Sequence, residues 1–446
     1  MGMYINGEKV ALSSCENKNS SDTPILNDKL PQVLNRTVHQ LSKEDFGDIT
    51  ELGDAALYMC QLLEDVELPD TLEVIGNKAF SICSSLTTIK IPKNVRQIGE
   101  ECFNNNQVMT SIDLSENEML ETVKKDAFKY NGELNVVISD INKFCDIEFE
   151  TYTANPTYIG HNIWYKDAIG TDITEVNLDT VINVGSYVFY NDPKIENLTI
   201  GNSVESIGDW SFYMCPSLVN IDFGNNLKFI GEKTFYGCDS IRSINIPSSV
   251  LSIGNYAFAT CELLNTIELN EGLDGIGDGA FSGVKNVTNL VIPNSVTYLG
   301  IDCFNTGSSS ENFPCFSNLV INKESQISML EERCFKQCGF SSITLPDNLS
   351  IIGPECFDSC LNLTKIEIPE NVMDIESKAF NNCWNLTTII FNSVMPPSIA
   401  PDAISEYTTH IFVPDEHIDN YKAEWPNLAD KIYPISSYDE FPEIEF

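Results

Sequence analysis

A repeat of 23 residues is the feature that most constrains how this chain can fold. Rows that begin at an Ile-Gly pair align with one another without gaps. Six rows have this length: residues 75–97, 207–229, 230–252, 253–275, 276–298 and 352–374. Less regular rows begin at Leu52, Ile98, Val123, Val184, Leu299, Leu330 and Ile375. A fixed period of this length indicates that one structural unit is stacked many times along the chain.

Each row predicts one short strand. Ile89 and Ile91 alternate with polar residues, as in a half-buried strand, and Pro92 then ends that strand because it has no amide hydrogen. One row has too little apolar surface to fold alone, so neighbouring rows must stack. The sequence therefore predicts an α/β leucine-rich repeat solenoid, right-handed, with about 13–14 turns of ~23 residues and a strand plus a short helical turn per repeat.

The second half of each row is expected to supply that helical turn. In the row that begins at Ile98, residues 100–105 form the turn, and Cys102 and Phe103 pack into the core. Gly99 is expected to adopt a turn conformation that bulkier residues disfavour. Lys124 occupies the same place in a later row, so a positive φ is not obligatory there.

Segments outside the regular rows divide the chain. Asn6-Gly7 suits a tight hairpin turn, and the stretch after it is rich in Ser, Asn and Asp. A nine-residue insertion at 307–315 lengthens one row and should protrude as a loop. The expected organisation is an N-terminal hairpin at 1–12, a linker at 13–40, leucine-rich repeats at 41–138, an irregular insertion at 139–183, leucine-rich repeats at 184–410, a C-terminal capping segment at 411–435 and an acidic tail at 436–446.

The C-terminal capping segment is expected to cover the open apolar end of the solenoid. Asp415 is a plausible helix N-cap, and Ile418, Tyr421 and Trp425 would share one face of the helix that follows. That face is predicted to pack against the last row.

The repeat explains most of the 15 cysteines. Only Cys15, Cys145 and Cys315 lie outside two fixed places in the row. Eight cysteines lie three residues after the Phe position and four lie directly before it, namely Cys60, Cys83, Cys215, Cys238, Cys261, Cys338, Cys360 and Cys383, and Cys102, Cys303, Cys334 and Cys356. No Cys-x-x-Cys pair is present, so buried free thiols are expected and no metal site. Thiol labelling of the native protein should reach at most the three outlying cysteines.

Charge and motif content exclude several functions. Asp and Glu number 65 against 26 Lys and Arg, a net charge of −39, which disfavours nucleic acid and anionic membranes as partners. No apolar stretch reaches the ~18 residues of a membrane helix. The four histidines lie outside the regular rows, and no phosphate-loop or calcium-loop motif occurs. We therefore expect no enzyme, no catalytic residues, no cofactor, no metal and no membrane insertion.

The rows share the pattern Ile-Gly-x-x-Ala-Phe-x-x-Cys-x-x-Leu-x-x-Ile-x-Ile-Pro, and this pattern resembles the BspA-like, or Treponema pallidum-type, leucine-rich repeats of bacterial surface proteins. Residues 144–165 and 411–435 resemble that family's non-repeat insertion and its terminal segment. The resemblance implies cell-surface display and adhesion to a host or matrix protein or a glycan. No secretion signal is visible, so the alternative is a structural spacer or a virion-associated repeat protein, in the cytoplasm or on a virion.

Two surfaces could bind a partner, and a monomer is expected to present either of them. The first is an aromatic stripe beside the Phe position, made of Tyr187, Tyr190, Trp210, Tyr213, Tyr236 and Tyr256. The second is the strand face, where outward residues are small and polar except for Val291 and Val320. Tyr and Trp are the residues that most often anchor protein contacts, which favours the stripe. The alternative interpretation is that these rings only cover their own rows.

Overall fold

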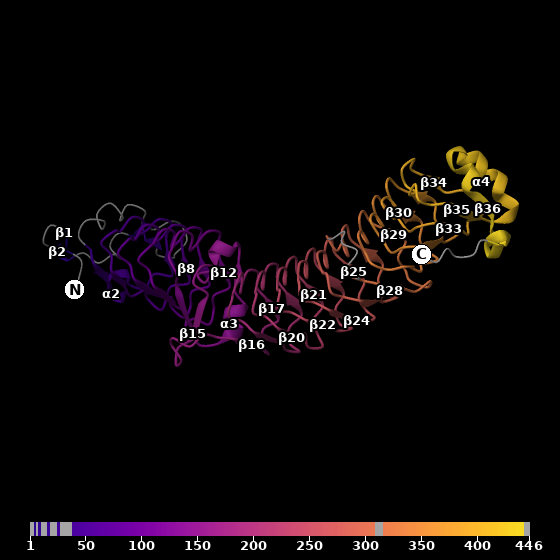
Figure 1. Ribbon diagram of the computed structural model, residues 1–446. Helices are drawn as coiled ribbons and strands as arrows, with labels where there is room; N and C mark the ends of the chain where they lie inside the picture. Colours follow the sequence, from indigo (N-terminus) through magenta and orange to yellow (C-terminus); the bar gives the residue numbers. More distant parts are fainter. Residues whose placement is uncertain are drawn as a thin grey trace. The chain divides into compact units, whose positions relative to one another are not determined.

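The fold, seen here in a computed structural model, is a β-solenoid of about 17 turns of about 23 residues, with parallel strands and little helix (Figure 1). Residues 38–307 and 315–440 are described, together with the backbone of four two-residue strands nearer the N-terminus. Two compact units, Met1–Ser217 and Leu218–Phe446, make up the chain. The turns outnumber the 13–14 counted from the sequence because the insertion at 139–183 and the terminal segments also supply strands.

The first unit contains two ladders of parallel strands, one on each side of the row. The ladder at the Ile-Gly pairs joins β6 (Glu51–Leu52), β8 (Val74–Ile75), β10 (Gln97–Ile98), β12 (Thr122–Val123) and β14 (Glu148–Phe149), and later β17 (Asn183–Val184) with β19 (Ser206–Ile207). The other ladder pairs β5 (Gln40–Leu41) with β7 (Asp65–Val66), joins β9 (Thr88–Lys90), β11 (Ser111–Asp113), β13 (Asn135–Ile138) and β15 (Asn162–Tyr165), and pairs β16 (Glu175–Leu178) with β18 (Asn197–Ile200).

Short elements outside these ladders complete the first unit. Near the N-terminus, β1 (Tyr4–Ile5) pairs antiparallel with β2 (Glu8–Lys9), and β3 (Glu16–Asn17) pairs with β4 (Ile25–Leu26). The helices are α2 (Lys43–Phe46), α3 (Ile141–Cys145) and the 3₁₀ turn η2 (Tyr152–Ala154). Most of the predicted linker, residues 308–314 of the predicted insertion at 307–315, and residues 441–446 of the predicted tail at 436–446 lie outside the described residues.

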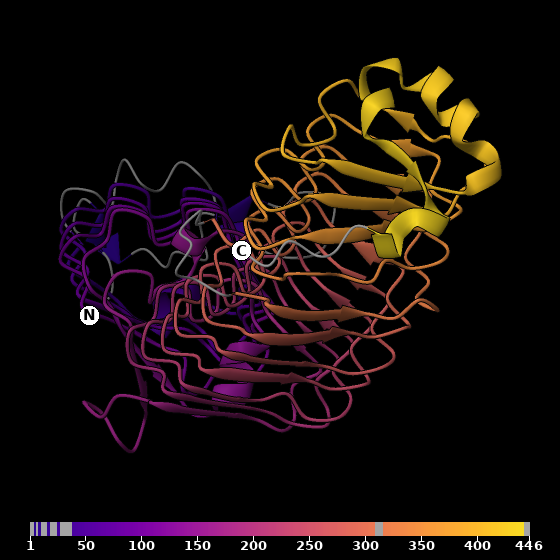
Figure 2. The ribbon, with the colours of Figure 1, turned by 45° about the vertical axis from the view of Figure 1, so that its right-hand side comes forward.

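The second unit repeats the same arrangement, and Figure 2 shows its longer strands side by side. The ladder at the Ile-Gly pairs joins β21 (Phe229–Ile230), β23 (Ser252–Ile253), β25 (Gly275–Ile276) and β27 (Tyr298–Leu299), and then β29 (Met329–Leu330), β30 (Ile351–Ile352), β32 (Asp374–Ile375) and β34 (Ser398–Ile399). The longer strands are β20 (Asn220–Asp222), the pair β22 (Ser243–Ile246) and β24 (Thr266–Leu269), the pair β26 (Asn289–Ile292) and β28 (Asn318–Ile321), and β31 (Lys365–Ile368), β33 (Thr388–Phe391), β35 (His410–Val413) and β36 (Ile432–Pro434).

A column of stacked phenylalanines forms the centre of each unit. In the first unit, the ring of Phe103 lies 5.3 Å from that of Phe80 and 5.2 Å from that of Phe128, and all three side chains are fully buried. In the second unit, the rings of Phe357 and Phe380 lie 5.3 Å apart and are almost parallel. The spacing follows from the separation of hydrogen-bonded strands, because each row places its Phe at the same point.

The cysteines of the repeat are buried, as predicted, and several of those that lie three residues after the Phe position also donate hydrogen bonds. The Cys215 thiol donates to the carbonyl of Phe189 at 3.1 Å, and the Cys383 thiol donates to that of Phe357 at 3.0 Å. Each bond reaches the Phe position of the preceding row, where the carbonyl also accepts a backbone amide of its own row. Cys145 and Cys315, which the sequence left open to labelling, are buried as well.

The predicted helical turn of each row is wrong in detail, because the chain forms successive tight turns there. Lys78 and Ile82 have positive φ values of 57° and 61°, and an α-helix cannot pass through such residues. Alternate amides bond to different partners: the Phe80 amide donates to the Cys102 carbonyl of the next row at 2.9 Å, whereas the Ser81 amide donates to the Lys78 carbonyl within the row. The backbone is therefore satisfied between rows as well as within them.

The glycine of the Ile-Gly pair is explained by close packing and not by its conformation. Gly99 is absent from the residues with positive φ, which corrects the expectation from the sequence. A Cβ atom at Gly99 would lie 2.5 Å from the backbone nitrogen of Asn77 and 2.5 Å from the carbonyl carbon of Gly76 in the preceding row. The absence of a side chain is what lets the two backbones approach.

The C-terminal segment packs on the last rows through two aromatic residues. Tyr421 and Trp425 are buried, and the Trp425 ring lies 5.0 Å from that of Phe391. The Tyr421 hydroxyl donates to the carbonyl of Ser393 at 2.8 Å. Figure 2 shows the helices of this segment, α4 (Ile418–Glu424) and the 3₁₀ segments η3 (Asp415–His417), η4 (Pro426–Lys431) and η5 (Ile435–Glu440), at the end of the stack.

Two details of the predicted cap differ. Asp415 is not the N-cap of α4, which begins after His417. Its carboxylate accepts the Ser436 amide at 3.0 Å, and hydrogen bonding to the Ser436 side chain, and then to this amide, lowers the pKa of Asp415. Ile418 is only partly buried, so Tyr421 and Trp425 make the packed face. The Tyr421 hydroxyl and the Trp425 indole N–H both donate hydrogen bonds to backbone carbonyls of the last rows, so the polar ends of these side chains are satisfied although they are buried.

Candidate functional site

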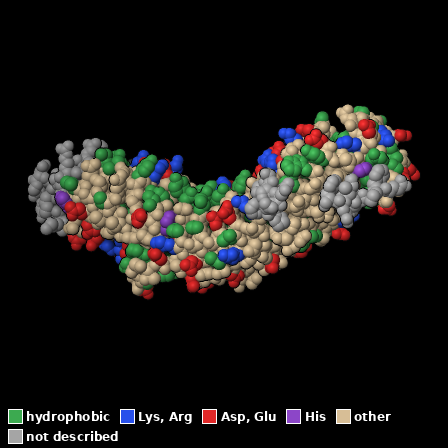
Figure 3. Space-filling model, in the orientation of Figure 1, with side chains coloured by type: hydrophobic (Ala, Val, Ile, Leu, Met, Phe, Trp, Pro, Cys, Tyr) green, Lys and Arg blue, Asp and Glu red, His purple; other side chains and the backbone are tan. Residues whose placement is uncertain are grey.

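The aromatic residues of the first unit lie on the turn side of the rows. Phe189 and Phe212 are fully buried, so the side chains that flank them in the sequence point towards the surface. Tyr190 and Tyr213 follow these phenylalanines directly, and Tyr187 and Trp210 precede them by two residues. All four are partly exposed. Figure 3 shows apolar side chains gathered along the edge of the molecule above β12 and β17.

The four rings form one cluster. The rings of Tyr190 and Tyr213 stack at 5.0 Å with an angle of 10° between their planes. Trp210 lies 4.7 Å from Tyr213 and 6.2 Å from Tyr187, and Tyr187 lies 6.0 Å from Tyr190. Every separation is in the range in which aromatic rings attract each other. We call these four residues, with the two described next, the aromatic platform.

Two members of the platform were not found from the sequence. Tyr152 stacks on Tyr190 at 5.1 Å, and Tyr158 meets Tyr152 edge-on at 6.2 Å. Both belong to the insertion at 139–183. Alignment of Phe149 with Val123 would have revealed Tyr152. The structure pairs these two residues between β14 and β12, and Tyr152 then lies in the same place of its row as Tyr187.

The remaining two stripe residues, Tyr236 and Tyr256, lie in the second unit. Tyr256 is 37% exposed, and its ring lies across the position of Gly279, where a side chain would collide with it. The Lys233 ammonium lies 5.5 Å from the centre of the same ring. Tyr256 is therefore packed partly against its own rows, whereas the first unit brings its aromatic residues together.

Burial raises the pKa values of two platform hydroxyls. For Tyr190 the neighbouring hydroxyls of Tyr213, Tyr152 and Tyr187 add to this effect, because negative charges on adjacent phenolates would repel one another. For Tyr158, burial outweighs the opposing effect of hydrogen bonds to the backbone. Tyr190 and Tyr158 therefore keep neutral hydroxyls, which can both donate and accept hydrogen bonds.

The strand face carries the second candidate surface. Val291 and Val320 are directly paired between β26 and β28, and they are 55% and 43% exposed. The predicted alternation is confirmed here, since Leu290 and Leu319 on the same strands are buried. Besides the two valines, this pair of strands exposes Asn289 and Asn318, whose side chains bond to each other at 2.8 Å. Two valines form a small apolar patch, which is weaker as an anchor than six rings.

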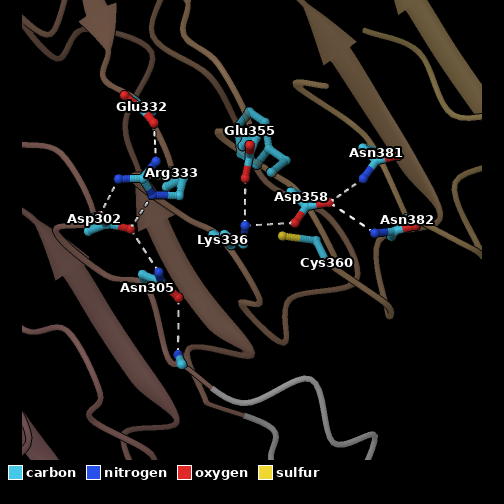
Figure 4. A network of polar contacts seen from close by, with 12 residues as sticks. Asp302, Asn305, Glu332, Arg333, Lys336, Glu355, Asp358, Cys360, Asn381 and Asn382 are labelled. Atoms are coloured by element: carbon cyan, nitrogen blue, oxygen red, sulfur yellow. Dashed lines mark hydrogen bonds and ion pairs between the residues drawn. The ribbon is translucent and has the colours of Figure 1, made fainter. Parts of the chain in front are cut away.

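A polar network in the second unit has a structural role (Figure 4). Arg333 donates to both carboxylate oxygens of Asp302, at 2.9 and 2.8 Å, and it also pairs with Glu332. Lys336 bonds to Glu355 at 2.6 Å and lies 3.0 Å from a carboxylate oxygen of Asp358. The hydrogen bond to Asp302 raises the pKa of Arg333. The contacts join successive rows and pair four carboxylates with two cations.

Within 38–307 and 315–440, no three His, Cys, Asp or Glu side chains gather as a metal site would require. His161 has a positive φ, and burial lowers its pKa. Burial likewise raises the pKa of Cys60, Cys315 and Cys383 to about 12, so these thiols are protonated and unreactive. Among the same residues, no helix has the length and apolar character to cross a membrane.

Stacked parallel strands, a central phenylalanine column and a short row with one strand at each side define a leucine-rich repeat solenoid. A family model described as the BspA type leucine rich repeat region matches residues 40–166, 182–311 and 308–411, with six copies. The chain therefore belongs to the BspA-type leucine-rich repeat family. None of the curated proteins compared with it matches.

Solved structures of bacterial leucine-rich repeat proteins are similar to this chain. A leucine-rich repeat protein from Bacteroides ovatus is 21% identical, with 94% of this chain and 97% of that one covered, at a TM-score of 0.56. A leucine rich cell surface protein from Faecalibacterium prausnitzii is 16% identical, with 95% and 94% covered, at a TM-score of 0.37. The first of these similarities shows the fold.

Proposed function

We propose that this chain is a non-enzymatic recognition protein that uses the aromatic platform to adhere to a protein or glycan partner, as a monomer at the cell surface. The single observation that carries the proposal is the gathering of six partly exposed or half-buried rings, from Tyr152 to Tyr213, on one part of a rigid repeat. Membership of the repeat family supports a binding role, because stacked rows present a long, pre-organised surface.

Energetic reasoning supports the platform over the strand face. Binding energy at protein interfaces is concentrated in a few Tyr, Trp and Arg anchors, and loss of one anchor costs about 2 kcal/mol or more, which is roughly 30-fold in affinity. Rings that are already fixed by their neighbours lose little conformational entropy on binding. The small polar residues of the strand face offer neither advantage. Val291 and Val320 are the next candidates if the platform fails.

The test is a binding screen with the full chain against extracellular matrix proteins and an array of glycans. Each partner found is then measured against the double variant Tyr190→Ser/Tyr213→Ser and the matched control Tyr298→Ser/Tyr407→Ser, which removes two exposed tyrosines elsewhere. We expect at least a tenfold loss for the platform variant and less than twofold for the control.

The competing function is a spacer that needs no specific ligand. It would be favoured if the screen finds no partner, or if both double variants bind every partner as the wild type does. Thermal unfolding of each variant confirms that the comparison is made between folded proteins.

A further inference from the structure

Tyr190, at the centre of the platform, has both faces of its ring covered by neighbouring tyrosines. Tyr190 lies between Tyr152 at 5.1 Å and Tyr213 at 5.0 Å, with interplanar angles of 23° and 10°. These two neighbours come from the rows before and after it, so they cover its two opposite faces. The cause is the repeat itself: rows stack about 4.8 Å apart, which is close to the contact distance of parallel rings.

This geometry disfavours sugars as ligands. A pyranose ring packs flat on an aromatic side chain, against the electron-rich face. At Tyr190 that place is taken by other tyrosines. What remains at Tyr190 is the edge of the ring and its hydroxyl group, which can make apolar contact and hydrogen bonds with a polypeptide. Tyr side chains used in this way give large contact area at low entropic cost.

The segment that carries most of the platform is acidic. Residues 148–217 contain ten Asp and Glu, two Lys and no Arg. The ammonium of Lys194 lies 3.0 Å from a carboxylate oxygen of Asp172, and Lys129, one row before the platform, lies 3.1 Å from one of Asp126. Asp209, which directly precedes Trp210, is exposed. This segment therefore attracts positively charged surfaces and repels acidic ones.

We infer that the partner of the aromatic platform is a polypeptide surface rich in Lys and Arg, and not a glycan. The inference rests on the proposed function and adds the chemical class of the partner. Ring edges and hydroxyls of Tyr152, Tyr190 and Tyr213 contact the polypeptide, and the surrounding carboxylates pair with its cations.

The test uses three defined probes on the full chain: a twelve-residue peptide (Arg-Leu-Ser)₄, its acidic counterpart (Glu-Leu-Ser)₄, and a β-1,4-linked glucose hexamer. Calorimetric titration at about 0.15 M salt limits unspecific attraction to the acidic chain. We expect the basic peptide to bind and the other two probes not to bind. Tyr190→Ser/Tyr213→Ser should weaken the basic peptide at least tenfold, against less than twofold for Tyr298→Ser/Tyr407→Ser.

A second variant keeps the test valid if the tyrosine variant is unstable. Asp209→Lys changes the charge beside Trp210, and Asp419→Lys makes the same change of net charge on α4 of the second unit. We expect at least a fivefold loss of affinity for the first and less than twofold for the second.

The outcomes separate this inference from the proposed function. Equal losses for the two Asp variants, or an unchanged basic peptide affinity in the platform variant, would show that net charge alone attracts the peptide, and would overturn the inference. Hexamer binding that is lost in the platform variant would also overturn it but would leave the proposed recognition role in place. The proposed function itself fails only if no partner from the screen depends on the platform.

Discussion

Replacing Asp192 by Asn should stabilise the protein at neutral pH. Asp192 is buried in the place of the row that holds Cys215 in the next turn, three residues after the Phe. Its carboxylate accepts the amides of Lys194 at 2.7 Å and Ile195 at 3.3 Å. Asn can accept the same two bonds, and this chain already uses it there: Asn106 accepts the Cys83 amide at 2.7 Å from an equivalent position.

The magnitude follows from the pKa of Asp192. Burial raises this pKa from 3.8 to about 6, against the opposing effect of its two backbone hydrogen bonds. At ~1.4 kcal/mol per pKa unit, the shift means that the ionised carboxylate destabilises the fold by up to about 3 kcal/mol above pH ~6. Between pH ~4 and ~6 the folded protein binds more protons than the unfolded chain, so this contribution to stability falls as the pH rises.

The assay is urea-induced unfolding of wild type and Asp192→Asn at several pH values. We expect the variant to be more stable by about 1–3 kcal/mol at pH ~7, with the difference shrinking towards zero near pH ~4. The control is Asp167→Asn, at an exposed turn, which should show no such pH-dependent difference. A variant that is equally stable or less stable at pH ~7, or a difference that does not depend on pH, would refute the reasoning.

Three further predictions concern packing. Gly99→Ala should lower the free energy of unfolding by about 2 kcal/mol or more, because a Cβ atom there would lie 2.5 Å from backbone atoms. Gly275→Ala is the control: a Cβ atom there has no neighbour within 4 Å, so thermal unfolding should be unchanged or shifted to slightly higher temperature. Trp425→Ala should lower the free energy of unfolding by about 3–5 kcal/mol and promote aggregation. The control Trp384→Ala, at a side chain that is 52% exposed, should lower it by less than ~1 kcal/mol. Equal melting temperatures of the two variants would exclude a capping role for the C-terminal segment. Thiol labelling of native protein should modify at most Cys15, since every cysteine in the described part of the chain is buried; rapid labelling at a second site without denaturant would contradict this.

The repeat period was enough to predict the fold class. Strands recur wherever Leu-x-x-Ile-x-Ile occurs, as at β9, and the burial of Cys102 and Phe103 follows from the same pattern. The reason is that each row contacts mainly its neighbours, so local sequence and long-range packing carry the same information. The identities of the stripe residues Tyr187 and Tyr213 were likewise readable from their places in the row.

Other features were decided only by the stacking of rows. The role of Gly99 depends on the backbone of the preceding row, and the alternation of positive φ at Lys78 and Ile82 depends on amides that bond to the next row. No pattern within one row contains those partners. The sequence therefore suggested a glycine conformation and a helical turn, where the structure has close backbone contact and successive tight turns.

The aromatic platform, too, was determined partly by the sequence and partly by the tertiary structure. The sequence by itself determined which places of the row hold Tyr and Trp. Only the tertiary structure added Tyr152, because an insertion that breaks the period still pairs β14 with β12 and so returns to register. Only the tertiary structure, too, decided that both faces of the Tyr190 ring are covered, since the strand spacing sets this ring face to face with Tyr152 and Tyr213.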